Sequence, residues 1–253
     1  MQSWKARQKG GAKIPKFIGR NRHKKRSEGP TEDLSGRLIT VTDPDSTATE
    51  AFRVLRTNLF YALVDEPPRV ITVTSPFPHE GKSTVCANLG VVLGQAEKNV
   101  LLLDCDFRKP VLHKVFGLRN LQGVVNILAG ERDLQGVLQR PLPGVNVVTV
   151  GPIPLNPSEL LSSRRFAEVL HRARQEFDYV LLDAGPVQLV ADAAVVAAQG
   201  DGVLLCLDAQ NTRKRAVVQS MRSLEAVGAK VFGTVMNNVK GSKMGPYYQR
   251  YTY

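Results

Sequence analysis

The sequence has little cysteine or histidine and lacks a long hydrophobic run. Its three cysteines, Cys86, Cys105 and Cys206, are scattered through apolar stretches, and its four histidines form no cluster typical of a metal site. We therefore expect buried free thiols in a reducing cytoplasm rather than disulfides or a structural metal. No apolar run approaches the roughly 20 residues that span a bilayer, and the charged N-terminus lacks the apolar core of a signal peptide. We therefore expect no membrane span and no secretory signal in this sequence.

The net charge of +11 is concentrated at one end of the chain. Residues 1–30 hold ten Lys or Arg and a single Glu, a net charge of +9, whereas the rest carries 24 basic and 22 acidic residues. Residues 1–36 are polar and without periodicity, so we expect a basic, disordered extension. Its run of Lys and Arg at 20–26 suits an anionic lipid surface. Nucleic acid, another acidic surface or no specific partner at all are alternatives at this stage.

The stretch from Val70 to Thr84 has the pattern of a strand, a tight loop and the start of a helix. The loop ends in Gly-Lys-Ser-Thr, the last part of a phosphate-binding P-loop, although Pro76 stands at the first glycine of that motif. In such a loop, backbone N–H groups at a helix N-terminus face the phosphates. We expect Lys82 to reach the β- and γ-phosphates of ATP and the Ser83 hydroxyl to bind Mg²⁺.

Two later apolar runs end in aspartates. Asp104 and Asp106 follow four apolar residues, a pattern of a strand buried on both faces, and their spacing points them to the same side of an extended chain. Asp183 ends a similar run, where a P-loop protein has its Walker B aspartate. Ligands of open α/β sheets bind at the carboxyl ends of strands, so these carboxylates are placed to organise Mg²⁺ or to accept a proton. The alternative is an aspartate that only caps the next helix.

Strands and helices alternate along most of the chain, and each predicted strand is almost wholly apolar. This alternation predicts an α/β fold of the P-loop NTPase type, with a predominantly parallel sheet covered by helices on both faces. We expect a single domain over residues 37–241 and a flexible, tyrosine-rich tail over 242–253. Beyond the P-loop, strands are predicted at 38–42, 145–150, 202–207 and 231–236, and helices at 47–63, within 111–140, and at 158–177, 191–198 and 213–227.

The predicted helix at 47–63, capped by Ser46 or Thr47, carries Glu50, Arg53 and Arg56 at spacings of three, opposite its apolar face. From these residues alone, a solvated face with a weak internal salt bridge is favoured.

The end of the chain is unusually rich in tyrosine. Four of the six tyrosines fall in the final seven residues, at Tyr247, Tyr248, Tyr251 and Tyr253. Nothing in this segment could bury them; the alternative is that they dock on the surface of the domain.

From about Pro44 onwards, these segments resemble the bacterial tyrosine autokinases of the capsule and exopolysaccharide type, or BY-kinases. The sequence departs from the family at His79, where glycine is usual, and at Ala184-Gly185-Pro186, where a small polar residue and two prolines are usual. The similar segments are 74–84 (Walker A), 102–110 (the A′ motif), 181–183 (Walker B), Glu50-x-x-Arg53-x-x-Arg56 (the ring-assembly signature), 156–161 and the tyrosine-rich tail.

The resemblance implies an ATP- and Mg²⁺-dependent protein tyrosine autokinase. Asp104 is then expected to accept the proton of the tyrosine hydroxyl, and Lys82 to neutralise charge on the transferred phosphoryl group. Tail tyrosines are expected to enter the active site of a neighbouring subunit in a ring, an octamer by family resemblance, assembled through Glu50, Arg53 and Arg56. The nucleotide is expected at Glu80, Gly81, Lys82, Ser83 and Thr84, and the metal at Ser83, Asp106 and Asp183.

The same resemblance places the protein in the cytoplasm, recruited to the inner face of the cell membrane, and gives it a role in capsular or exopolysaccharide synthesis and export. Expected partners are a transmembrane activator of the polysaccharide chain-length-regulator type and a tyrosine phosphatase, with the basic tail on anionic membrane and no nucleic acid. One rival is a switch-like ATPase of the division-site or chromosome-partition type, but residues 74–80 lack the extra lysine of that class. A second rival is a non-catalytic module that binds through its basic tail.

Overall fold

The computed structural model describes residues 36–61 and 68–240. Within them, seven strands form one sheet in the order β3-β4-β2-β5-β1-β6-β7, and every neighbouring pair is parallel except β3 and β4. This arrangement confirms the predicted P-loop type of α/β fold. The strands are β1 (Val70–Thr74), β2 (Val100–Asp104), β3 (Gln139–Leu142), β4 (Val145–Val148), β5 (Tyr179–Asp183), β6 (Gly202–Asp208) and β7 (Val231–Asn237).

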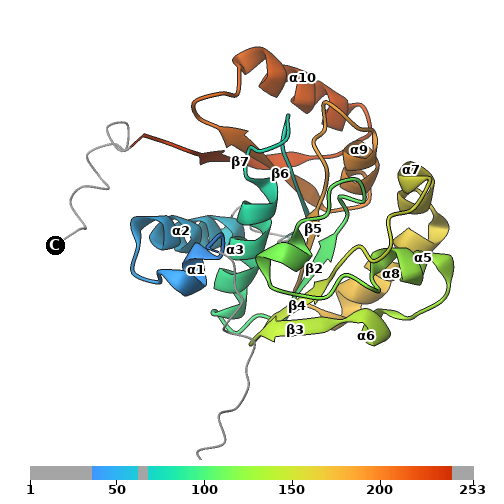
Figure 1. The fold of residues 1–253 in the computed structure, drawn as a ribbon. Coiled ribbons are helices and arrows are strands. Elements are labelled where there is room, and N and C mark those ends of the chain that lie inside the picture. The colour runs from blue at the N-terminus through green and yellow to red at the C-terminus, as the bar shows by residue number, and fades with distance from the viewer. Residues whose placement is uncertain (1–35, 62–67, 241–253) are drawn as a thin grey trace, which may run out of the picture.

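Helices cover both faces of the sheet (Figure 1). On one face α3 lies against the strands, and α1 and α2 pack on its outer side; α8, α9 and α10 cover the opposite face. The helices are α1 (Ile39–Thr42), α2 (Thr47–Tyr61), α3 (Lys82–Gly94), α4 (Leu112–Val115), α5 (Val124–Ala129), α6 (Leu134–Val137), α7 (Pro157–Leu161), α8 (Arg164–Glu176), α9 (Asp192–Ala197) and α10 (Lys214–Glu225).

Each face of the sheet has its own hydrophobic core. Successive residues of β2 enter opposite cores: Leu101 and Leu103 pack with residues of the helices on the α8 side, and Val100 and Leu102 pack on the α3 side. All four side chains are fully buried. A strand covered on both faces has no solvent-facing positions, which is why its sequence is a continuous apolar run rather than an alternating one. Each buried leucine contributes roughly 1.5–3 kcal/mol.

The strand order brings the carboxyl ends of β1, β2 and β5 next to one another, at one end of the sheet. β5 lies between β1 and β2, so that Asp183 is aligned with Val73 on one side and with Asp104 on the other. The loop after β1 and the helix α3 therefore begin beside the carboxyl ends of β2 and β5. Because ligands of open α/β sheets bind at this edge, the topology positions a site there.

Residues 38–42, predicted as a strand, form the short helix α1 instead. The Val41 and Thr42 amides both donate to the Leu38 carbonyl, and the Thr40 amide and hydroxyl donate to Asn88 Oδ1 of α3 at 3.1 and 2.8 Å. Leu38 is fully buried. The β-branched residues of this segment favour a strand locally, but packing and hydrogen bonds to α3 override that preference.

The helix predicted at 47–63 is α2, which ends at Tyr61 within the described residues; residues 62 and 63 lie outside them. Ser46 caps the helix as predicted, because its hydroxyl oxygen accepts a hydrogen bond from the Thr49 amide at 3.2 Å. Leu59 is buried, and Phe52 and Leu55 pack against the core on the α3 side. The apolar face of α2 therefore covers α3, as its sequence pattern indicates.

The single helix predicted at 158–177 is two helices, α7 and α8. Ser163 separates them: its hydroxyl donates to the Leu160 carbonyl at 2.7 Å and accepts from the Phe166 amide at 3.2 Å, so that it caps α8. A serine in this role favours the end of one helix and the start of the next. The edge strand β3 was also not predicted, and its Pro141 is compatible with a strand only at an edge or a bulge.

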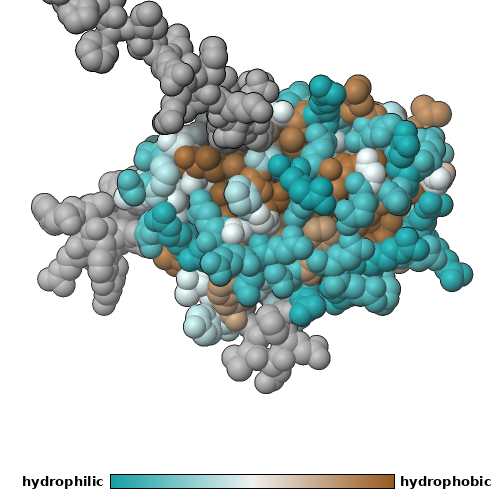
Figure 2. Space-filling view, turned by 90° about the horizontal axis from the view of Figure 1, so that it is seen from below, coloured by the Kyte–Doolittle hydropathy of each residue, from teal (hydrophilic) through white to brown (hydrophobic). Residues whose placement is uncertain are grey.

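All three cysteines are buried and unpaired, as predicted. Burial raises the pKa of the Cys86 and Cys105 thiols, so these groups stay protonated and unreactive. No helix in the described ranges is both long enough and apolar enough to cross a bilayer. Figure 2 shows one face of the molecule, on which hydrophilic residues surround several separate groups of apolar residues.

Candidate active site

The loop between β1 and α3 has two residues in the left-handed region, His79 (φ 67°) and Gly81 (φ 89°). At Gly81 a Cβ atom would lie 2.4 Å from Asn237 Nδ2, and that amide donates to the Glu80 carbonyl at 2.8 Å. Position 81 therefore requires glycine for both conformation and space. His79 adopts its conformation at a cost of roughly 1 kcal/mol, which explains why glycine suits this position.

The carboxylate of Glu80 holds the loop from within. Its Oε2 accepts from the Phe77 amide at 2.7 Å, and its Oε1 accepts from the hydroxyl of Thr212, which follows β6. Glu80 was predicted to bind the nucleotide, but it is buried and does not line the cleft described below. The contacts of Glu80 fix the shape of the P-loop, whereas Gly81 to Thr84 face the cleft.

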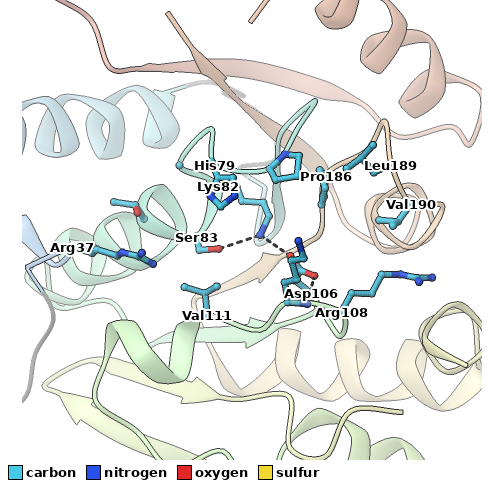
Figure 3. A pocket seen from close by; sticks show the side chains of 14 residues that line it. Arg37, His79, Lys82, Ser83, Asp106, Arg108, Val111, Pro186, Leu189 and Val190 are labelled. Atoms are coloured by element: carbon cyan, nitrogen blue, oxygen red, sulfur yellow. Dashed lines mark hydrogen bonds and ion pairs between the residues drawn. The ribbon is translucent and has the colours of Figure 1, made fainter. Parts of the chain in front are cut away.

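Lys82 is the centre of the charged groups at this edge of the sheet (Figure 3). Its Nζ lies 2.9 Å from Asp106 Oδ2 and 3.7 Å from Asp183 Oδ1, and it donates to Ser83 Oγ at 3.2 Å. Burial alone would lower the pKa of Lys82, but the Asp183 and Asp106 carboxylates raise it above its ordinary value. The lysine therefore stays protonated.

Asp183 is fully buried, and neither of its carboxylate oxygens has a hydrogen-bond partner within the part of the chain that the structure describes. Burial raises the pKa of this carboxyl group. A buried carboxylate whose charge is balanced only by an ammonium group 3.7 Å away, here that of Lys82, costs free energy unless a ligand adds donors. The open oxygens of Asp183 therefore suit donors brought by a ligand, such as the water molecules of a hydrated cation.

Asp104 is also fully buried, but its oxygens are occupied. Its Oδ2 accepts from the Val111 and Leu112 amides at 3.1 Å each, and its Oδ1 accepts from the Asp106 amide at 3.3 Å. Burial and the neighbouring Asp183 raise its pKa. Asp104 thus holds the start of α4, which was the alternative interpretation of this aspartate, and it lies next to Asp183 without lining the cleft.

The cleft itself has a volume of about 370 Å³ and opens over the P-loop. Backbone amides at the start of α3 and the Lys82 ammonium at its floor are groups that bind phosphate. The cleft is lined by Arg37, Pro78, His79, Gly81, Lys82, Ser83, Thr84, Asp106, Arg108, Lys109, Val111, Pro186, Leu189 and Val190.

The donor set fits magnesium better than a protein-enclosed metal. Among the described residues, no group of three or more His, Cys, Asp or Glu side chains could hold a metal. Mg²⁺ typically takes one or two protein ligands and completes its octahedron with water and phosphate oxygens. The Ser83 hydroxyl, the Asp106 carboxylate and the Asp183 carboxylate, whose oxygens accept no hydrogen bond in the described ranges, form such a partial set.

Two predicted groups lie away from the cleft or outside the structure. On α2, Arg53 Nη1 lies 3.0 Å from Glu50 Oε2 at the surface, whereas Arg56 Nη1 donates to the Val92 carbonyl of α3 at 2.8 Å. The three residues therefore have different surroundings, and Arg56 is bound to its own subunit. The four tail tyrosines lie outside the described residues.

Several residues at the site were not predicted as site residues. Asn237, Arg37, Arg108 and the apolar residues after Pro186 contact the P-loop or line the cleft. For Asn237 the sequence carries a signal, because it is a polar residue directly after the last apolar strand. Arg108 is similarly signalled by its place two residues after Asp106. Arg37 has no such signal, since it precedes α1.

Comparison with known proteins places residues 71–251 in the family described as the CobQ/CobB/MinD/ParA nucleotide binding domain. Tyrosine-protein kinase YwqD of Bacillus subtilis is 37% identical over 211 residues, which cover 83% of this chain and 89% of the relative. Tyrosine-protein kinase wzc of Salmonella typhimurium is 37% identical over 218 residues, 85% of this chain but 30% of the relative. The chain thus spans most of the first relative and less than a third of the second.

Solved structures agree with the sequence comparison. The kinase domain of the Escherichia coli tyrosine kinase ETK matches with a TM-score of 0.77 and 34% identity, and the match covers 80% of each chain. The septum site-determining protein MinD of Pyrococcus horikoshii, solved with Mg-ADP, matches with a TM-score of 0.57 and 24% identity, over 66% of this chain and 69% of that one. The second likeness shows a shared fold alone.

Proposed function

This chain belongs to the family of bacterial tyrosine-protein kinases, and we propose that it phosphorylates tyrosines of its own C-terminal segment between neighbouring subunits. In this reaction the bond from the β,γ-bridging oxygen of ATP to the γ-phosphorus breaks, and a bond from the tyrosine oxygen to that phosphorus forms. The tyrosine gives up its proton and ADP leaves. The observation that carries the proposal is the convergence of Lys82, Asp106 and Asp183 beside the P-loop.

Phosphoryl transfer depends mainly on positioning and on electrostatic stabilisation of the transferred group. The amides from Gly81 to Thr84 would hold the phosphates, and the Lys82 ammonium would neutralise charge on the γ-phosphoryl oxygens. Ser83 would be a direct ligand of Mg²⁺, with Asp106 and Asp183 holding its waters. When bound there, Mg²⁺ would supply positive charge that offsets the negative charge of the phosphates.

A carboxylate has to orient and deprotonate the tyrosine, because a phenol with a pKa of about 10 does not ionise unaided at neutral pH. Family resemblance assigns this role to Asp104. Its pKa is raised by burial and by Asp183, which makes its ionised form a stronger base. Asp106, which lines the cleft, is the alternative acceptor because it has direct access to a bound substrate.

The proposal is tested by mapping phosphotyrosine on the full chain by mass spectrometry after incubation with ATP and Mg²⁺. We expect phosphate on Tyr247, Tyr248, Tyr251 or Tyr253 and none after replacement of all four by Phe. Removal of residues 1–30 is expected to leave the reaction intact, whereas a binder that works through its basic tail would lose its function. ATP hydrolysis without any phosphotyrosine would instead favour the switch-like ATPase.

We further propose that the subunits assemble into a ring, an octamer by family resemblance, through the surface of α2. Arg53→Ala is expected to give a smaller particle by light scattering while the free energy of unfolding changes by less than about 0.5 kcal/mol, because its ion pair is exposed. Arg56→Ala is expected to lower stability by about 1 kcal/mol as well, because it removes a hydrogen bond to α3. An unchanged particle mass in both variants would exclude this surface from the assembly.

The partners and cellular role also belong to the proposal. Names of the relatives such as the tyrosine-protein kinase wzc support a tyrosine kinase, and family resemblance supports action in capsular or exopolysaccharide synthesis at the inner face of the cell membrane. A transmembrane activator of the chain-length-regulator type and a tyrosine phosphatase would complete the cycle. Adding a cytoplasmic fragment of such an activator to the mapping experiment would test the first of these partners.

A further inference from the structure

A buried carboxylate holds an arginine at the mouth of the cleft. Arg108 Nε donates to Asp192 Oδ2 at 2.7 Å, and the hydroxyl of Ser158 donates to the other oxygen of Asp192. Asp192 is only 3% exposed, whereas the Arg108 side chain is 49% exposed. Two elements distant in sequence, α7 and α9, thus orient a side chain that follows β2.

The outer end of the Arg108 guanidinium is available to a ligand. Within the described part of the chain, its only hydrogen bond is the one from Nε to Asp192. The side chain runs away from Lys82 and towards the Val190 segment (Figure 3). A guanidinium fixed through Nε presents its two terminal nitrogens as a fork, the geometry that matches a phosphoryl group.

One part of the cleft lining is apolar. Pro186, Leu189 and Val190 form it, and Leu189 is 59% exposed. An aromatic ring can pack on such a wall while its hydroxyl points towards the phosphate site. The cleft therefore combines a place for phosphoryl transfer, a surface for an aromatic side chain and, at its mouth, an oriented cation.

The acceptor segment has no anionic side chain until it is phosphorylated. Residues 241–253 contain no Asp or Glu, and consecutive tail tyrosines are one, three and two residues apart. In an extended chain, residues two apart are separated by about 6.6–6.8 Å. A phosphate on one tyrosine, carrying a charge of about −1.5 to −2, would thus lie near the cleft when its neighbour occupies the transfer site.

We infer that Arg108, oriented by Asp192, binds a phosphotyrosine already formed on the acceptor segment and thereby favours phosphorylation of a neighbouring tyrosine. This inference rests on the proposed function and deepens it. Arg108 would be a binding residue for the primed substrate, and Asp192 a positioning residue. The chain would then accumulate multiply phosphorylated tails rather than a mixture of singly phosphorylated ones.

The test compares two synthetic peptides of residues 242–253 with the full-length protein as the enzyme. One peptide is unphosphorylated and the other carries phosphotyrosine at position 251; new phosphate is quantified by mass spectrometry. We expect the primed peptide to have a kcat/KM about fivefold higher, mainly through KM. Arg108→Ala should abolish this preference, and Arg108→Lys and Asp192→Asn should reduce it. Arg164→Ala, which changes an exposed arginine on α8, should leave the preference at the wild-type value.

The outcomes separate this inference from the function on which it rests. A wild-type enzyme that phosphorylates both peptides equally well would overturn the inference and leave the kinase proposal standing. A preference that survives in Arg108→Ala would also overturn it. So would an equal loss on both peptides with a raised KM for ATP, because the anion bound by Arg108 would then be a phosphate of the nucleotide. No phosphorylation of either peptide, or of the protein's own tail, would overturn both proposals.

Discussion

Replacement of Lys82 by Met is expected to lower the rate of tyrosine phosphorylation by about 10³-fold. Lys82 is the cation that contacts both Asp106 and Asp183, at 2.9 and 3.7 Å. Methionine fills similar space but leaves the transferred phosphoryl group without its ammonium partner. The measurement is phosphotyrosine formed per subunit with ATP and Mg²⁺, and Lys114→Met, a change at an exposed lysine on α4, serves as the matched control.

The same variant tests transfer between subunits. Lys82→Met protein keeps its tail tyrosines, so a second protein whose four tail tyrosines are Phe should phosphorylate it when the two are mixed. Phosphate on the Lys82→Met chain in the mixture, and none on that chain alone, is the expected result. Undiminished phosphotyrosine in the purified variant alone would contradict the mechanism at its central residue.

Lys82→Met should also make stability depend more strongly on pH. Burial raises the pKa of both Asp104 and Asp183. A carboxyl group with a raised folded-state pKa favours the folded state below its unfolded pKa, and that contribution is lost as the pH rises through the folded pKa. Without the lysine, this loss is no longer offset. The variant should therefore be closest to wild-type stability in mild acid and fall behind as the pH rises.

Local patterns predicted the parts of the site that depend on strand ends. Asp104, Asp106 and Asp183 each follow an apolar strand, and a parallel sheet brings such ends to one edge. The same reasoning could not reveal that the Asp104 carboxylate accepts hydrogen bonds from backbone amides at the start of α4. These hydrogen bonds depend on how residues 107–112 fold. Whether an aspartate faces a ligand or the backbone is set by the chain that follows it.

Contacts between distant segments were beyond prediction for a different reason. The Asn237 side-chain amide donates a hydrogen bond to the Glu80 carbonyl, and the two residues are 157 positions apart in the sequence. Ser158 and Arg108 both donate to Asp192, from which they are 34 and 84 positions away. No periodicity in a single sequence encodes such pairings. The error at α1 has the same origin, because Asn88 of α3 supplies the hydrogen bonds that make residues 39–42 helical.

Asp183→Asn is expected to separate activity from stability. Its carboxylate is buried beside Asp104 and accepts no hydrogen bond in the described ranges, and Lys82 lies nearer to Asp106 (2.9 Å) than to Asp183 (3.7 Å). Because Lys82 keeps the Asp106 carboxylate as its partner, removing the charge of Asp183 should raise the free energy of unfolding by about 1–2 kcal/mol. For a chain of this size that is a rise in Tm of a few degrees, about 2–8 °C. The rate of tyrosine phosphorylation should nevertheless fall by about 10²-fold, because the support for the metal's waters is lost.

Asp201→Asn is the matched control, because the environment of that carboxylate is the opposite. Burial alone would raise the pKa of Asp201, but hydrogen bonds from the Val70 and Arg69 amides and from Arg174 lower it. Its contribution to stability is present above the unfolded pKa and is lost as the pH falls through the folded pKa. At neutral pH, Asp201→Asn should therefore destabilise by about 1 kcal/mol, a deficit that disappears in acid. The gain from Asp183→Asn should instead grow as the pH rises, and a loss of stability in both variants would show that Asp183 is satisfied by the fold rather than left open for a ligand.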